Sequence, residues 1–401
     1  MNDKPAVRLW TGELHAPSAT PPFTLVLRHP GVLRRLVFSR DPLVLAEAYI
    51  QGDLDVEGDW YAVLSLKDHI ENLSLTWRDK FHLWRDAWSL TPRRSATPDA
   101  SKRFAHRHSR ASDHQAVSFH YDVSNEFYAL WLDHERVYSC AYFEDANDSL
   151  HDAQCQKLHH ICRKLRLRPG ERFLDIGCGW GALVCWAAKH YGVKAHGITL
   201  SKEQLAFASE RIRLEGLGDR VTVELRDYRD LPSDGGYDKI ASIGMVEHVG
   251  LARMPAYLNA VRQALRPNGL FLNHGITHDD EGWHEATATR FINRYVFPDA
   301  ELDCIGNMQL CMERAGFEIH DVEGLRPHYA LTLRHWVNRL ERHKHEAVRC
   351  AGEAIYRTWR LYMAACALEF DTGGMGIYQV LASKRHRGAW PLPLTRRDLY
   401  A

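Results

Sequence analysis

The chain of 401 residues carries 51 basic and 51 acidic side chains, so no overall positive field favours nucleic acid as a partner. Hydrophobic residues make up 45% and charged residues 25% of it, which is ordinary for a globular protein long enough for two domains. No apolar run approaches the roughly 20 residues of a membrane-spanning helix, and the first residues, MNDKPAVRLW, lack the apolar core of a secretion signal. The nine cysteines include no CxxC pair, which predicts reduced thiols in a cytoplasmic protein and no metal site.

The first part of the chain, residues 1–90, alternates short apolar runs with turns, as in FTLVLRHP, GVLRRLVFSR and LVLAEAYIQGDLDVEGDW. This pattern predicts a small α+β domain. The following stretch, TPRRSATPDASKRFAHRHSR, is basic and rich in Pro and Ser, which is typical of an exposed linker. We therefore expect a linker over residues 91–112 and a second domain over residues 113–401.

A segment dense in aromatic and histidine side chains opens the second domain. It reads HYDVSNEFYALWLDHERVYSCAYF over residues 120–143 and follows no helical or strand period. Such a segment is typical of a binding-site wall, and equally of a loop packed over a core. A helix is expected next, at about 151–167.

From residue 172 onward, strands and helices alternate. The predicted strands are RFLDIG, KAHGITL, VTVELRDY, YDKIASIGM, LFLNHGI and, near the end, GIYQVLASK. The predicted helices lie at 182–192, 201–216 and 254–265, and a long helical region covers about 331–370. This alternation predicts an α/β fold with a doubly wound, mainly parallel sheet.

A glycine-rich loop, DIGCGWG, joins the first of these strands to a helix, where free backbone N–H groups can meet a ligand. The loop alone fits a nicotinamide cofactor, S-adenosylmethionine or a tight turn. A dinucleotide-binding unit usually has an acidic residue at the end of the next strand. Here Thr199 stands at that place, with Gln204 one helical turn later, which disfavours a nicotinamide cofactor.

The motifs DIGCGWG, GITLSKEQ, SIGMVEHVG, NHGIT and FINRYVFPDAEL, together with the aromatic segment, resemble the cyclopropane-fatty-acyl-phospholipid synthase family, which includes the mycolic acid cyclopropane synthases. AEAYIQGDLDVEGD resembles part of the N-terminal domain of the bacterial phospholipid enzymes. The resemblance implies a class I S-adenosylmethionine-dependent methyltransferase with a Rossmann-like sheet. The cofactor-binding residues that it implies are Tyr138, Ser139, Asp175, Gly177, Gly179, Gly181, Thr199, Leu200, Ser201, Gln204, Asp227, Tyr228 and Arg229.

The resemblance also implies a chemistry. Methylation of a double bond by S-adenosylmethionine creates a carbocation, from which a bound bicarbonate removes a proton. Water must be kept out, and aromatic rings tolerate a cation. The residues implied for this site are Glu247, His274, Tyr329, Cys140 and Ile276, the last through its backbone, and Cys366 matches a cysteine that the family associates with activity. Cys366 lies in an apolar helical stretch, which favours a packing role.

We therefore expect a cyclopropane-fatty-acyl-phospholipid synthase. The first alternative is a fatty-acyl methyltransferase that leaves a branched or methylene chain, and the second is a small-molecule N-methyltransferase. A non-catalytic lipid-binding protein is disfavoured by the intact glycines and by Glu247.

The expected partners are unsaturated phospholipids at a membrane surface, and the resemblance allows a homodimer. The expected location is the cytoplasm, in peripheral association with the inner membrane surface. Segment 283–302 is expected to cover the pocket and to line the acyl channel, or to pack on the sheet as an amphipathic helix. Among the basic clusters, we favour the linker as the membrane-docking surface. The clusters are Arg34, Arg35 and Arg40; Lys102, Arg103, Arg107 and Arg110; and Lys384, Arg385 and Arg387.

Overall fold

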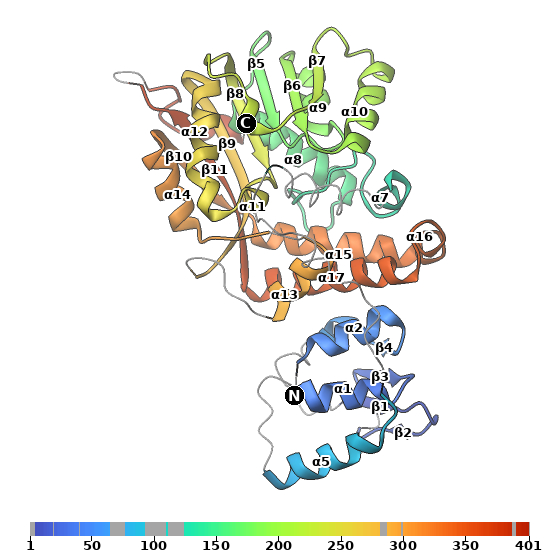
Figure 1. The fold of residues 1–401 in the computed structure, drawn as a ribbon. Coiled ribbons are helices and arrows are strands. Elements are labelled where there is room, and N and C mark those ends of the chain that lie inside the picture. The colour runs from blue at the N-terminus through green and yellow to red at the C-terminus, as the bar shows by residue number, and fades with distance from the viewer. Residues whose placement is uncertain are drawn as a thin grey trace.

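The computed structural model describes residues 5–18, 20–39, 41–64, 77–92, 110, 124–280, 287–297, 300–386 and 390–400. Figure 1 shows a small sheet near the N-terminus and a large sheet, with helices α15 and α17 between them. Within the described residues, no helix is both long and apolar enough to cross a bilayer.

The N-terminal unit, which we define as the described residues from 5 to 92, is a four-stranded sheet with four described helices. The strand order is β2-β1-β3-β4, with β1 and β3 parallel and the other pairs antiparallel. This arrangement confirms the predicted α+β character. The elements are β1 (Ala6–Arg8), β2 (Leu14–His15), β3 (Phe23–Leu27), α1 (Gly31–Ser39), α2 (Leu43–Gln51), β4 (Leu54–Gly58), α3 (Trp60–Leu64) and α5 (Trp77–Ser89).

The large sheet has seven strands in the order β10-β11-β9-β8-β5-β6-β7. Strands β9 to β7 run parallel, whereas β11 pairs antiparallel with both β9 and β10. The strands are β5 (Arg172–Ile176), β6 (Lys194–Thr199), β7 (Val221–Leu225), β8 (Tyr237–Ile243), β9 (Leu265–His278), β10 (Phe317–Gly324) and β11 (Met375–Lys384). The predicted doubly wound sheet is confirmed.

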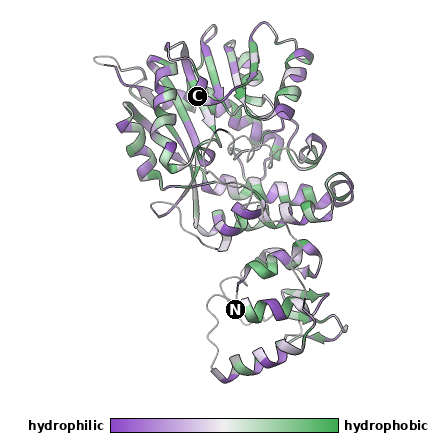
Figure 2. Cartoon of the chain, viewed as in Figure 1, coloured by the Kyte–Doolittle hydropathy of each residue, from purple (hydrophilic) through white to green (hydrophobic). Residues whose placement is uncertain are grey.

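Helices cover both faces of this sheet, because successive strand residues point to opposite sides. Phe173 packs into a core with α8 and α9, whereas Leu174 packs into another core with α12 and α14. The strands are largely hydrophobic, and the outer helices alternate hydrophobic and hydrophilic segments (Figure 2). The helices of this half are α7 (Asn125–Trp131), α8 (Leu150–Lys164), α9 (Ala182–Tyr191), α10 (Lys202–Leu214), η2 (Tyr228–Asp230), α11 (Val246–Val249), η3 (Leu251–Arg253), α12 (Met254–Ala264), α13 (Thr287–Tyr295), α14 (Ile305–Arg314), α15 (Arg326–Arg342), α16 (Lys344–Ala351), α17 (Glu353–Thr372) and η4 (Arg397–Leu399).

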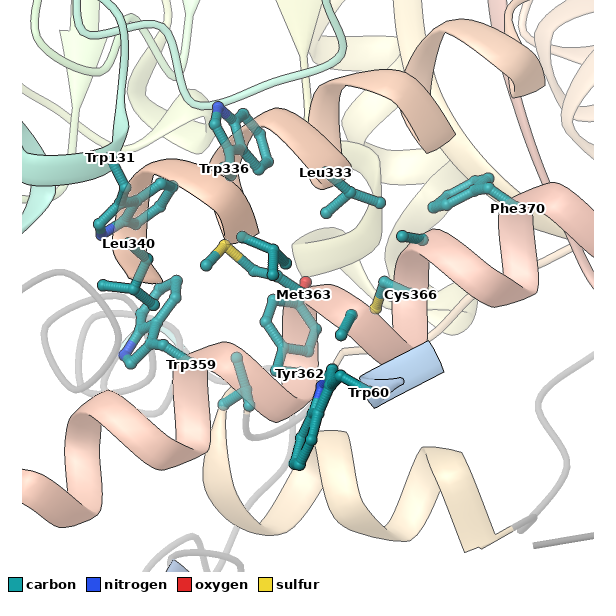
Figure 3. Close-up of a cluster of buried hydrophobic side chains, with 14 of the residues drawn as sticks. Trp60, Trp131, Leu333, Trp336, Leu340, Trp359, Tyr362, Met363, Cys366 and Phe370 are labelled. Atoms are coloured by element: carbon teal, nitrogen blue, oxygen red, sulfur yellow. The ribbon is translucent and has the colours of Figure 1, made fainter. Parts of the chain in front are cut away.

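A third core joins the N-terminal unit to the helices below the sheet. Trp60 of α3 belongs to the same buried cluster as Trp131 of α7, Trp336 of α15 and Trp359 of α17, and Figure 3 shows these rings gathered around α17. The Trp131 ring centroid lies 5.5 Å from that of Trp336 and 5.4 Å from that of Trp359. Aromatic rings at such separations attract each other beyond simple burial.

Two arginines of α17 hold the N-terminal unit. Arg357 donates to the carbonyl oxygen of Tyr49 at 3.1 Å and to Asp55 Oδ2 at 3.1 Å. The Arg360 guanidinium lies 3.9 Å from the centroid of the Trp60 ring. The unit is therefore fixed to α17 by directional contacts as well as by the shared core.

Two features of the fold differ from the prediction. The helical region 331–370 is three helices, because the chain turns at His343 and again at Gly352, whose φ is +89°. Helix α14 and strand β10 were not predicted. The domain limits 1–90, 91–112 and 113–401 stay predictions, since most of the linker lies outside the described residues.

Candidate active site

The glycine-rich loop follows β5 and leads into α9. Gly177 and Gly179 both have left-handed backbones, with φ of +80° and +54°. A Cβ on Gly177 would lie 2.6 Å from Met245 Cγ, whereas a Cβ on Gly179 would meet no atom within 4 Å. Gly177 is thus required by packing, and Gly179 leaves the backbone open to a ligand.

The end of β6 is fixed by side chains that cap α10. Thr199 Oγ1 donates to Gln204 Oε1 at 2.8 Å and accepts from the amide of Ser201 at 3.2 Å. Ser201 Oγ accepts from the amide of Gln204 at 3.3 Å, so Ser201 is the helix cap. At the place where a dinucleotide-binding unit has an acidic residue, this chain therefore has a turn whose polar side chains hydrogen-bond to one another and to its backbone.

These elements enclose what we call the first cavity. Eight of the predicted cofactor-binding residues line it: Tyr138, Ser139, Asp175, Gly177, Gly179, Thr199, Leu200 and Gln204. Gly181 and Ser201 lie beside it as the caps of α9 and α10. Asp227, Tyr228 and Arg229 are not among its lining residues. Asp227 caps η2, and Tyr228 packs against Tyr257, so their contact with an adenine stays a prediction.

A buried acid and a buried lysine share the first cavity. Burial raises the pKa of Asp175 to about 7, and the nearby charge of Lys157 opposes this rise. Burial lowers the pKa of Lys157 to about 8, and its Nζ donates to Ser139 Oγ at 2.9 Å. Asp175 Oδ1 has no partner within the described chain. Lys157 was missed in the sequence, because a lysine in an amphipathic helix usually marks the solvent face.

A second cavity adjoins the first, and all six predicted catalytic residues line it: Cys140, Glu247, His274, Ile276, Tyr329 and Cys366. Tyr138, Ser139, Ile243, Gly244 and His248 line both cavities. The two spaces therefore share a wall. The predicted catalytic residues come from the segment after α7 and from α11, β9, α15 and α17, so the fold brings distant residues together.

Glu247 stands in the one-turn helix α11, immediately after β8. The amide of Ile276 donates to its Oε1 at 2.8 Å, so this backbone donor already serves the protein's own carboxylate. The Oε2 atom is buried and has no partner within the described residues. Burial raises the Glu247 pKa to about 7, against the hydrogen bond from Ile276. The group can therefore gain or lose a proton near neutral pH.

His274 lies inside β9 and faces Gln379 of the neighbouring strand β11. Gln379 Nε2 lies 3.3 Å from His274 Nδ1, and an amide nitrogen can only donate, so Nδ1 accepts. Burial and the charge of Lys157 hold the His274 pKa well below its usual range. The ring is therefore neutral and carries its proton on Nε2, a buried atom without a partner in the described chain. Gln379 was missed in the sequence, because only the strand pairing places it there.

The two cysteines of this cavity are protonated thiols. Cys140 Sγ donates to the carbonyl oxygen of Ala141 at 3.2 Å, and burial raises its pKa far above the usual range. Burial raises the pKa of Cys366 to about 12, although Tyr362 hydrogen-bonds to it. Neither thiol is activated as a nucleophile. Tyr329 packs against Phe370, with ring centroids 4.7 Å apart.

The aromatic segment, residues 120–143, both packs in a core and forms part of a cavity wall, the two roles that its sequence left open. Phe127, Tyr128 and Trp131 are fully buried in the third core, whereas Tyr138 and Cys140 line cavities. Residues 120–123 lie outside the described part. Within segment 283–302, residues Thr287–Tyr295 form helix α13. Ile292, Phe297, Ala300 and Leu302 of this segment line the second cavity, and residues 283–286, 298 and 299 are outside the described part.

The residues present fit the two implied small molecules. The unpartnered Asp175 Oδ1 is an acceptor for an ammonium group, and the open side of Gly179 admits a ligand against the backbone, as S-adenosylmethionine requires. Bicarbonate has one O–H donor and several acceptor lone pairs. Glu247 Oε2 offers an acceptor and His274 Nε2–H a donor on one cavity.

Comparison with known proteins identifies close relatives of the whole chain. Residues 108–380 match a protein family described as mycolic acid cyclopropane synthetase. A probable fatty acid methyltransferase of Pseudomonas putida is 41% identical over 98% of this chain and 95% of its own length. The cyclopropane-fatty-acyl-phospholipid synthase of Escherichia coli is 38% identical over 66% of each chain. The crystal structure of the mycolic acid cyclopropane synthase CmaA1 with SAH and CTAB aligns with a TM-score of 0.64 at 33% identity, covering 68% of this chain and 98% of that one.

Proposed function

This chain belongs to the mycolic acid cyclopropane synthetase family of S-adenosylmethionine-dependent methyltransferases, and from that premise we propose that it converts the cis double bond of an unsaturated phospholipid acyl chain into a cyclopropane ring. The observation that carries the proposal is the second cavity, where Glu247 Oε2 and His274 Nε2 are buried without partners among the described residues, beside a largely apolar lining.

S-adenosylmethionine, when bound, supplies an electrophilic methyl group. The wall shared by both cavities, with Tyr138, Ser139 and Gly244, is where that donor and a double bond in the second cavity would meet. Methyl transfer to one alkene carbon leaves a cation on the other. Apolar side chains such as Ile292, Leu333 and Phe370 exclude the water that would trap it.

Ring closure then requires loss of one proton from the added methyl group. Glu247 and His274 would hold a bicarbonate ion, which supplies the base. Glu247, whose pKa is about 7, would accept the O–H proton of that ion, and His274 Nε2–H would donate to one of its anionic oxygens. Mass balance gives a net gain of one CH2 for each double bond.

A second candidate is methylation without ring closure, because the Pseudomonas putida relative is described as a fatty acid methyltransferase. An N-methyltransferase is disfavoured by the apolar lining of the second cavity. A ring and a branched chain differ in whether the proton leaves the added methyl group or the acyl chain, and a ring and a methylene chain differ in their bonding. Isotope labelling combined with NMR separates the three products.

Monounsaturated phospholipid and S-adenosylmethionine with a trideuterated methyl group are incubated with the full chain, and the acyl chains are analysed by mass spectrometry and NMR. Ring closure predicts two retained deuteriums and cyclopropane proton resonances. Three retained deuteriums would show methylation with proton loss from the chain, and two deuteriums on a vinylidene carbon, detected by deuterium NMR, would show a methylene product. In carbonate-free buffer the wild type should slow several-fold; an unchanged rate would exclude a bicarbonate base.

A further inference from the structure

Helix α5 of the N-terminal unit carries an aromatic stripe that faces solvent. Trp77, Phe81, Trp84 and Trp88 follow one another at intervals of four, three and four residues, which places them on one helix face. Their exposed fractions run from 49% at Trp84 to 73% at Trp77. Phe38 of α1 extends the stripe, with its ring centroid 6.1 Å from those of Trp84 and Trp88.

Basic side chains accompany these rings. The Arg78 guanidinium lies 5.4 Å from the Trp77 ring centroid, and that of Arg34 lies 5.5 Å from Trp88. At about 100° per residue, Arg78 and Arg85 both border one side of the stripe, and Asp86 lies about 180° from Trp77. The Arg85 guanidinium reaches back to Asp86 Oδ1 at 3.0 Å. The apolar face is thus accompanied by the charges of Arg34 and Arg78, whereas the charge of Arg85 is paired with Asp86.

Trp84 and Trp88 pack against Phe38 of α1, yet all three rings remain exposed to solvent. Ala87, on another face of α5, is buried and lies on the side of the helix that packs against the rest of the unit. Other large exposed apolar side chains in the described residues, such as Leu214, Leu310 and Leu394, are scattered over separate elements. A contiguous patch of rings bordered by basic residues marks an interaction surface. Tryptophans beside arginines are the composition of helices that lie in a membrane interface.

We propose that the aromatic stripe, defined as Trp77, Phe81, Trp84, Trp88 and Phe38, docks the protein on an anionic phospholipid bilayer, with α5 lying in the plane of the headgroups. This proposal rests on the proposed function, since a substrate held in a bilayer requires a docking surface. Helix α5 packs on α1, and the N-terminal unit is held by α17, whose Tyr362, Cys366 and Phe370 line the second cavity. The aromatic stripe is therefore linked, through the packing of the N-terminal unit on α17, to a helix that lines the second cavity.

The basic clusters of the sequence analysis are less suited where the structure describes them. Arg35 pairs with Glu47, Arg110 pairs with Asp230, and Lys384 donates to the carbonyl oxygen of Leu265. Arg40, Lys102, Arg103, Arg107 and Arg387 lie outside the described residues, so docking through the linker stays a prediction.

The test uses the full chain and sedimented vesicles of equal parts dioleoyl phosphatidylglycerol and dioleoyl phosphatidylcholine. The triple variant Trp77→Gln/Phe81→Gln/Trp88→Gln should bind at least tenfold more weakly than the wild type. The matched control, Leu214→Gln/Leu310→Gln/Leu394→Gln, removes three exposed apolar side chains elsewhere and should bind normally. Both variants should keep the wild-type circular dichroism spectrum and S-adenosylmethionine affinity. Arg78→Gln/Arg85→Gln should weaken binding to these vesicles but not to pure phosphatidylcholine.

Equal vesicle binding by the wild type and the aromatic variant, or no binding by either, would overturn the docking proposal. A dimer that becomes monomeric in the aromatic variant during ultracentrifugation, with vesicle binding unchanged, would assign the stripe to a second copy of the chain instead. Product analysis separates this proposal from the proposed function. A wild type that docks through the stripe but modifies no acyl chain would leave the docking surface standing and remove the assigned activity.

Discussion

At the scale of single residues, Lys157 and Asp175 together determine the charge inside the first cavity. With Lys157→Met, Asp175 loses the nearby charge that lowers its pKa, so it should be protonated at pH 7 and lose its attraction for a cationic ligand. We expect S-adenosylmethionine to bind about tenfold more weakly at pH 7, about 1.4 kcal/mol, and to regain affinity toward pH 9. Calorimetry across this range measures the effect. In an Asp175→Asn background, Lys157→Met should cause no further pH-dependent loss; an equal loss there would contradict the account.

Glu247 should make the protein less stable as the pH rises. Its folded pKa, about 7, lies above the usual value of 4.5, so the folded state holds this proton more tightly and is stabilised by it below about pH 4.5. That stability is lost as the pH rises to about 7. Glu247→Gln removes the buried charge, and its free energy of unfolding should exceed that of the wild type by on the order of 2 kcal/mol at pH 8. Urea titrations at pH 5 and pH 8 check this, and a difference that does not grow with pH would refute the burial argument. The same variant should lose turnover but keep its cofactor affinity.

A substitution at Gly179 should affect cofactor binding and leave the fold intact. Gly179→Val fills the open side of the loop and strains a left-handed backbone by about 1–2 kcal/mol. The protein should fold and lose S-adenosylmethionine binding. Gly216→Val is the matched control, because Gly216 also has a left-handed backbone, with φ of +66°, and nothing within 4 Å of its Cβ position. It should show the same loss of stability with normal affinity in calorimetry. Normal affinity in folded Gly179→Val would remove this loop from the cofactor site.

The sequence allowed us to predict site residues that stand in short motifs. It did not reveal residues whose role depends on burial or on strand pairing. Glu247 and His274 stand in short motifs, and the structure places both on one cavity. Lys157 could not be recognised, because nothing local distinguishes a buried helical lysine from a solvated one. Gln379 could not be recognised either, since its contact with His274 depends on the register of two strands more than 100 residues apart.

At the scale of elements, the attachment of the N-terminal unit to α17 depends on Arg357. This buried guanidinium donates to Tyr49 and Leu54 carbonyl oxygens and to Asp55. Arg357→Met would remove these hydrogen bonds, although Asp55 keeps its pair with Arg28, and should cost about 2 kcal/mol of stability. Thermal denaturation monitors the loss. Arg213→Met removes an exposed arginine paired only with Glu210 and should leave the melting temperature unchanged. A similar shift in both variants would mean that the buried contacts contribute nothing specific.

Elements with a strong local period were predictable. Strands β5 and β8 are short apolar runs bounded by turns, and α12 repeats its apolar residues at helical spacing. Strand β10, FEIHDVEG, mixes acidic and apolar residues because it lies at the sheet edge, so its sequence carries no buried-strand signal. The break at Gly352 was also hidden, since one glycine inside a helical pattern can be tolerated.

At the scale of the whole molecule, one buried cluster spans both sheets. Val32 and Trp60 of the N-terminal unit belong to the same core as Trp336 and Phe370. A shared core couples the two halves, so thermal unfolding should be a single transition, with equal calorimetric and van't Hoff enthalpies. Differential scanning calorimetry tests this. Two resolved transitions would show that the halves are energetically independent.

The place of β11 in the large sheet has a consequence for synthesis on the ribosome. This strand, residues 375–384, is inserted between β9 and β10, although both of those precede it in the chain. A nascent chain can pair β5 to β9 as they emerge, but β10 has no neighbour until β11 arrives. The sheet edge at β9 stays open for that interval and needs shielding from other chains. Translation that stops before residue 375 would therefore release a product in which β9 has one open edge and His274 lacks the Gln379 amide that orients it.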